Sequence, residues 1–123
     1  MALLAWILAI FYLVNGATMM AAPEWWYGAT PGVSGTGPFN PHFVVDVGIA
    51  FAVSGGMVAW GASGGGWRLI LAGAAFPLGH ALFHIVERLS GHGHGPIAVE
   101  IFGVMLPAAA ALWLASTMRG KET

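Results

Sequence analysis

The chain has 123 residues, of which 58% are hydrophobic and only 7% are charged. Soluble domains carry about 25% charged residues, so this composition excludes an ordinary soluble domain and indicates a membrane protein. Four Lys or Arg residues provide no basic surface for nucleic acid, and the lack of cysteine excludes disulfides and thiolate metal sites.

Apolar runs of the length of membrane spans occupy most of the chain. A membrane-spanning helix needs about 20 mostly apolar residues. We expect four such spans, at about residues 2–22, 41–60, 67–89 and 96–118. The sequence therefore predicts an all-α fold, with residues 1–123 forming a single transmembrane domain built as a four-helix bundle. Pro77 and Pro107 lie inside the third and fourth spans, so we expect kinks there.

The longest predicted loop runs from Pro23 to Asn40. It begins with an acid and three aromatic residues typical of a membrane interface and continues as a tract rich in glycine and proline. Before it, Asn15 and Gly16 interrupt the first span. A small residue beside an amide favours close helix packing with a hydrogen bond across it.

Basic residues predict the orientation in the membrane. Arg68, Arg119 and Lys121 lie on the side of both termini, and the opposite side has only Arg88. Because cytoplasmic loops carry an excess of Lys and Arg, we expect both termini in the cytoplasm.

Two stretches place ionisable side chains inside apolar runs. His42 and Asp46 are four residues apart, as are His80 and His84, so each pair shares one face of a helix. A helix rise of about 1.5 Å per residue brings these four, with Glu87 and Glu100, to the outer half of the bundle. Ionisable groups are costly within a membrane and normally face a partner, a cavity or a ligand.

The sequence therefore predicts a transition-metal site between helices in the outer half of the bundle, as bundle cores commonly hold metals. Imidazole and carboxylate ligands suit zinc, iron, manganese or copper(II), and the sequence does not choose among them. Haem held by His42 and either His80 or His84 is a less favoured cofactor, because it needs a broad apolar slot. The candidate metal ligands are His42, Asp46, His80, His84, Glu87 and Glu100.

A purely structural alternative stands beside the metal site. In it, Asp46 hydrogen-bonds His80 or His84 and locks the second helix to the third. For Glu100, a role as an interfacial acid at a helix N-terminus, stabilised by the helix dipole, is favoured equally with a role as a metal ligand.

Other ionisable residues favour simpler roles. Arg88 is expected to be an interfacial anchor that forms a local ion pair with Glu87. His92 and His94 lie in a glycine-rich loop, where solvent exposure is favoured over capture of a metal ion.

Two motifs resemble those of a family of small, uncharacterised bacterial four-span membrane proteins. They are residues 37–48, which read GPFNPHFVVDVG, and residues 80–84, which read HALFH. The family patterns are similar to Asn-x-His-x-Val-Arg-Asp-x-Gly and Pro-His-x-x-x-His, and the resemblance implies a multi-pass protein of the bacterial inner membrane without supplying an activity. The arginine of the first pattern is Val45 here, which favours a metal or a protonated histidine as the partner of the acid. The matching motif positions are His42, Asp46, His80 and His84.

Three functional hypotheses follow. The first is a metal-binding membrane protein, with redox activity as an open option. The second is a non-catalytic accessory subunit that packs against other membrane subunits or copies of itself, in which the polar cluster is an interhelical lock. The third is an ion or proton pathway, which a nearly apolar inner half disfavours. The lipid bilayer is the expected partner in each case, and no serine–histidine–acid arrangement indicates hydrolysis.

Overall fold

The computed structural model describes residues 1–122, without the side chains of Lys121 and Glu122. The orientation argument from Lys121 therefore rests on a side chain outside the described ones. Within residues 1–122 all regular structure is helical, which confirms the predicted all-α class. Four helical stretches of this part of the chain are long and apolar enough to cross a membrane: Ala2–Ala21, Pro41–Gly65, Trp67–Leu89 and Ile97–Gly120.

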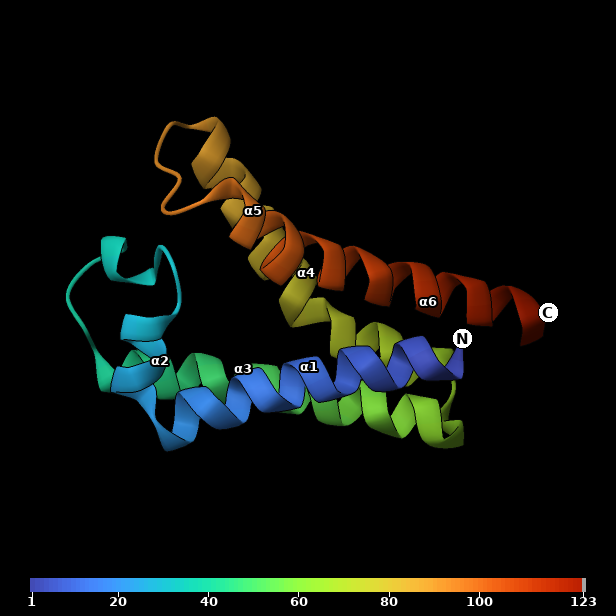
Figure 1. Ribbon diagram of the computed structural model, residues 1–123. Coiled ribbons are helices and arrows are strands. Elements are labelled where there is room, and N and C mark those ends of the chain that lie inside the picture. Colours follow the sequence, from blue (N-terminus) through green and yellow to red (C-terminus); the bar gives the residue numbers. More distant parts are fainter. Residues whose placement is uncertain (123) are drawn as a thin grey trace.

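Figure 1 shows the long helices running back and forth between the two ends of the bundle, with both termini at one end. We call this the terminal end, and the opposite end, which carries residues 22–40 and 90–96, the histidine end. The long helices are α1 (Ala2–Ala21), α3 (Pro41–Trp60), α4 (Trp67–Leu89) and α6 (Leu106–Glu122). The short elements are α2 (Pro23–Ala29), η1 (Val33–Gly35), η2 (Gly61–Gly65), α5 (Ile97–Glu100) and η3 (Ile101–Met105).

The helix α2 lies in the segment that the sequence predicts as a loop, so that prediction is wrong for residues 23–29. Pro23 occupies the first turn, where a helix has no use for its missing N–H, and Glu24 lies near the positive end of the helix dipole. These signals are visible in the sequence. Tyr27 of α2 donates a hydrogen bond to the carbonyl of Gly37, which ties the following loop back to the helix.

Helices α1 and α3 form the most closely packed pair. A Cβ atom on Gly16 would lie 2.5 Å from the carbonyl oxygen of Gly48 and 2.7 Å from the backbone nitrogen of Ala52. The predicted close approach at Gly16 is therefore present. The neighbouring Asn15 bonds to α2 rather than to another long helix: Trp26 Nε1 donates to its Oδ1 at 2.9 Å.

Helix α4 packs against α3 on one side and α6 on the other. A Cβ atom on Gly73 would lie 2.7 Å from the carbonyl oxygen of Ser54, so the α3–α4 contact also depends on a glycine. The buried face of α6 combines small side chains with one large one, since Ala108, Ala111 and Ala115 are at most 1% exposed and Leu114 is fully buried. Small residues let helix backbones approach closely without a driving force from water.

Both prolines lie where the long helices depart from straight packing. Helix α4 continues through Pro77, and Figure 1 shows its second half diverging from the α1/α3 pair. Pro107 follows the π-helical turn η3. Proline removes an N–H and clashes with the carbonyl four residues earlier, and a widened turn relieves both problems.

Candidate functional site

The histidine pair of α4 lies just beyond Pro77. The ring centres of His80 and His84 are 4.6 Å apart with an angle of 76° between the ring planes, and both side chains are half-buried. His80 stacks on Phe76 one turn earlier, with 5.7 Å between ring centres. It also meets the edge of Phe51 from α3 at 5.7 Å. Two aromatic rings therefore position His80, and His80 contacts His84.

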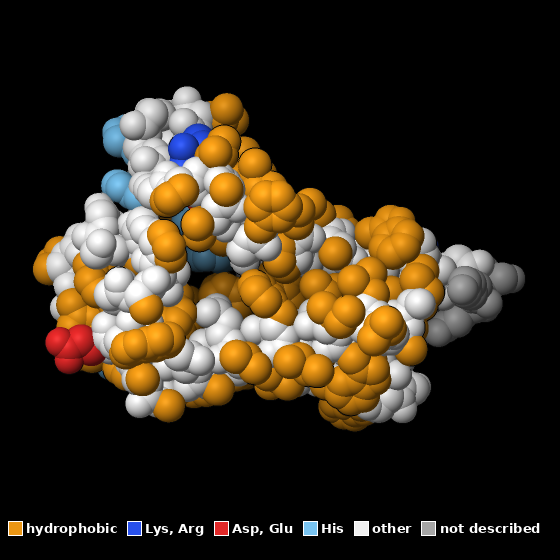
Figure 2. Space-filling model, viewed as in Figure 1, with side chains coloured by type: hydrophobic (Ala, Val, Ile, Leu, Met, Phe, Trp, Pro, Cys, Tyr) orange, Lys and Arg blue, Asp and Glu red, His pale blue; other side chains and the backbone are white. Residues whose placement is uncertain are grey.

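A hollow lies between the α1/α3 pair and the diverging arm of α4 and α5, and Figure 2 shows a histidine side chain in its depth. Within the described part of the chain, neither His80 nor His84 has a hydrogen-bond or ion-pair partner for its imidazole. Their ring nitrogens are therefore available to an external ligand. The divergence of α4 beyond Pro77 is what makes room for one.

The pair on α3 is arranged differently. His42 Nε2 lies 3.2 Å from Asp46 Oδ2, as their spacing of four residues predicts. Their side chains are 88% and 57% exposed. Asp46 thus has its ion-pair partner on its own helix, and the structure shows no Asp46 bond to His80 or His84 among the described residues. The expected Asp–His lock between α3 and α4 is not formed.

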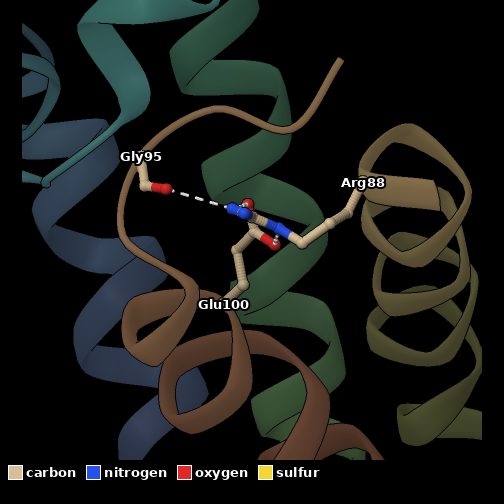
Figure 3. Close-up of polar contacts among 3 residues, drawn as sticks. All are labelled: Arg88, Gly95 and Glu100. Carbon is tan, nitrogen blue, oxygen red and sulfur yellow. Dashed lines mark hydrogen bonds and ion pairs between the residues drawn. The ribbon is translucent and has the colours of Figure 1, made fainter. Parts of the chain in front are cut away.

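A polar link instead joins α4 to α5. Arg88 Nε and Nη2 donate to the two carboxylate oxygens of Glu100, both at 2.6 Å, and Nη2 also donates to the carbonyl of Gly95 at 3.0 Å. Figure 3 shows the guanidinium between these two partners. The predicted pairing of Arg88 with Glu87 is therefore wrong. Glu100 is only 4% exposed, so it is a buried partner of Arg88, and it lies in the first turn of α5 as its helix N-terminal alternative expects.

The two loops at the histidine end touch. A Cβ atom on Gly95 would lie 2.5 Å from the Cα of Gly32, and one on Gly35 would lie 3.8 Å from His94 Nδ1. His94 is half-buried and, like His84, lies within electrostatic range of Glu100. His92 is exposed, in agreement with the solvated role expected for it.

The six predicted ligands thus separate into smaller groups. His42 pairs with Asp46, His80 contacts His84, and Glu100 is occupied by Arg88. The Glu87 side chain is half-buried and, in residues 1–122, has no ion pair or hydrogen bond. No three His, Asp or Glu side chains of the described residues lie close enough together to hold one metal ion. The metal-binding role of these residues stays a prediction.

Sequence reasoning missed the aromatic partners of His80. Phe76 precedes His80 by four residues, so the helical spacing already placed both on one face, and this signal was readable. Phe51 belongs to another helix, and no local pattern could reveal its contact with His80. A separate apolar pocket of about 400 Å³ lies between α1 and α2, away from the predicted ligands, and its lining includes Phe11, Trp25 and Trp26.

Comparison with known proteins does not identify a family for this chain. No protein-family model, no curated protein and no solved structure matches the chain. The resemblance of residues 37–48 and 80–84 to the motifs of small bacterial four-span proteins therefore stays a prediction.

Proposed function

We propose that this membrane protein binds a transition-metal ion through the imidazoles of His80 and His84. The observation that carries the proposal is their arrangement: two half-buried rings one helical turn apart, 4.6 Å between centres, without hydrogen-bond partners in the described part of the chain. Two histidines at this spacing on one helix face can chelate a single ion, as in helical zinc motifs.

The chemistry of the pair favours particular ions. Imidazole nitrogens suit zinc, copper, iron and nickel, whereas magnesium and calcium prefer carboxylate and carbonyl oxygens. Because no three His, Asp or Glu side chains of the described residues converge, His80 and His84 are the two proposed protein ligands, and Glu87 is left out of the site. A site with two protein ligands leaves at least one position for water or a substrate. With copper or iron, the site would be redox-active.

Metal analysis of the protein purified in detergent tests this proposal. We expect one zinc or copper ion per chain after equilibration with the metal and removal of the excess. His80→Ala and His84→Ala should each weaken binding at least about tenfold, since each removes a ligand. His92→Ala is the matched control, because it removes an exposed histidine from the same end of the protein and should leave the affinity unchanged.

The outcomes separate the possibilities. Loss of binding in both α4 variants with normal binding in His92→Ala supports the site. Substoichiometric metal in the wild type, or equal losses in all three variants, overturns it. An absorption spectrum of the same sample adds a second readout, because a Soret band would identify haem in place of a bare ion.

The exposed pair on α3 is tested separately. His42 and Asp46 are predicted ligands, and their spacing also suits chelation of a metal ion. Because they are exposed and pair with each other, we do not include them in the proposed site. Asp46→Asn should therefore leave the metal affinity of the purified protein unchanged. A tenfold loss of metal affinity would show that Asp46 is a ligand after all.

A role as a subunit of a larger membrane complex is the second proposal. It is favoured by the small number of ligands within the described chain, because a partner could supply those that complete the coordination. Cross-linking in native membranes followed by purification tests it. A partner recovered with the wild type in fixed ratio supports this role, and a monomer that binds metal with full stoichiometry contradicts it.

A further inference from the structure

A cluster of one indole and two guanidinium groups lies at the terminal end of the bundle. The Cζ of Arg68 is 4.8 Å from the ring centre of Trp67, and the Cζ of Arg119 is 5.4 Å from the same ring centre. Trp67 and Arg68 begin α4, whereas Arg119 lies near the end of α6. Two cations from different helices therefore gather at a single ring.

The positive charges of this cluster have no described counterion. Neither Arg68 nor Arg119 forms a hydrogen bond or ion pair with a described side chain, and both are exposed. Four carboxylates have described side chains, and the course of the chain places them toward the histidine end (Figure 1): Glu24, Asp46, Glu87 and Glu100.

Attraction to the Trp67 ring holds both guanidinium groups at the same indole despite their like charge. The distances to the shared ring keep the two charges no more than about 10 Å apart, so salt screens their repulsion only in part. An anion that contacts both guanidinium groups would offset this repulsion. Guanidinium groups match the oxygens of a phosphate with paired hydrogen bonds, which makes phosphate the preferred anion.

We propose that Arg68 and Arg119, held by Trp67, bind the phosphodiester of an anionic phospholipid. The cluster lies at the ends of two membrane-spanning helices, at the level where lipid headgroups lie. Exposed apolar side chains continue from it into the spans: Leu71, one turn beyond Trp67, is 38% exposed, and Leu112 of α6 is 44% exposed. A phospholipid can bind the arginines through its phosphate and the apolar side chains through its acyl chains. Free phosphate can bind the arginines only.

This proposal is independent of the metal site. It concerns the opposite end of the molecule and other residues, so either can fail alone.

Native mass spectrometry of the detergent-purified protein provides the test. The protein is titrated with phosphatidylglycerol, with phosphatidylcholine, and with phosphatidylglycerol in the presence of excess inorganic phosphate. We expect one phosphatidylglycerol to bind in preference to phosphatidylcholine, with inorganic phosphate failing to displace it. Each arginine should contribute about fivefold to the affinity, so R68Q/R119Q should weaken binding about 25-fold.

Matched variants identify the source of the effect. K121Q removes one positive charge from the same C-terminal segment and should change phosphatidylglycerol affinity less than R119Q does. R119K keeps the charge but loses the planar guanidinium group. Its affinity for phosphatidylglycerol should therefore lie between those of R119Q and the wild type. Equal binding of the two lipids, displacement by inorganic phosphate, or equal effects of K121Q and R119Q would each overturn the proposal.

Discussion

Arg88 and Glu100 face each other across the loop of residues 90–96 and form two hydrogen bonds of 2.6 Å. The guanidinium also binds the carbonyl of Gly95, so one side chain fixes both the loop and the start of α5. Glu100 is buried, whereas the Arg88 side chain remains 30% exposed. The pair therefore attaches the diverging end of α4 to the chain segment that leads into α6.

Breaking this pair should destabilise the protein. Glu100→Gln leaves the guanidinium without its carboxylate and should lower the thermal unfolding midpoint in detergent by several degrees. Arg88→Lys retains the charge but cannot form two parallel hydrogen bonds, so a smaller decrease is expected. Glu24→Gln is the control, because Glu24 is exposed and has no ion pair in the described structure.

A double variant checks that the two residues act together. Arg88→Gln combined with Glu100→Gln should be less destabilised than the sum of the single changes, since each single change leaves a partner uncompensated. Additive losses would contradict the direct coupling of Arg88 and Glu100.

The glycine contact between α1 and α3 gives a second prediction. In Gly16→Ala, the new methyl group meets the backbone of Gly48 and Ala52, which cannot move aside as a side chain can. We expect a loss of about 1–3 kcal/mol in the free energy of unfolding. Gly56→Ala lies in α3 with nothing within 4 Å of the added Cβ, so it should be neutral or stabilise by up to about 1 kcal/mol.

Unfolding in mixed micelles by a denaturing detergent measures both variants. A Gly16→Ala protein as stable as the wild type would show that α1 and α3 do not approach as closely as described.

The buried hydroxyl of Tyr12 gives a third prediction, of opposite sign. Tyr12 is 1% exposed, and its hydroxyl has no hydrogen-bond partner among the described residues. An unpaired buried polar group costs about 1–3 kcal/mol, so Tyr12→Phe should increase the free energy of unfolding. Tyr27→Phe is the control: it removes the donor to the Gly37 carbonyl and should decrease stability. A decrease in Tyr12→Phe would indicate a partner for this hydroxyl.

The contact between the two loops gives a fourth prediction. Gly95 and Gly91 have φ angles of +80° and +79°, so alanine introduces the same backbone strain at either position. Only at Gly95 does the added Cβ meet Gly32. Gly95→Ala should therefore separate the loops and speed hydrogen exchange of the amides of Gly35 and Thr36, whereas Gly91→Ala should not. Equal exchange in the two variants would contradict the loop contact.

The spans were predictable because their signal is local. Apolar runs of sufficient length identify α1, α3 and α4, and the predicted bounds agree with the structure to within one or two residues. The i,i+4 rule likewise anticipated the contacts of His42 with Asp46 and of His80 with His84. The short helix α2 was missed, although Pro23 and Glu24 marked its start.

The partners between helices were not predictable in the same way. Depth along the membrane placed Asp46, His84 and Glu100 at one level, but depth does not determine the direction in which a helix face points. Asp46 is exposed and bonded within α3, whereas Glu100 faces Arg88. The divergence of α4 beyond Pro77 depends on packing with α3 and α6, and no single-helix pattern contains that information.

The divergence of α4 has a mechanical consequence. The α1/α3 pair and the α4/α6 pair each hold together through small residues, and they meet where Gly73 approaches Ser54 and Gly61 approaches Ile70. A rotation of one pair against the other about that region would change the width of the hollow without separating either pair. Because the loops touch above the hollow, a molecule could enter sideways between helices, from the lipid phase rather than from water.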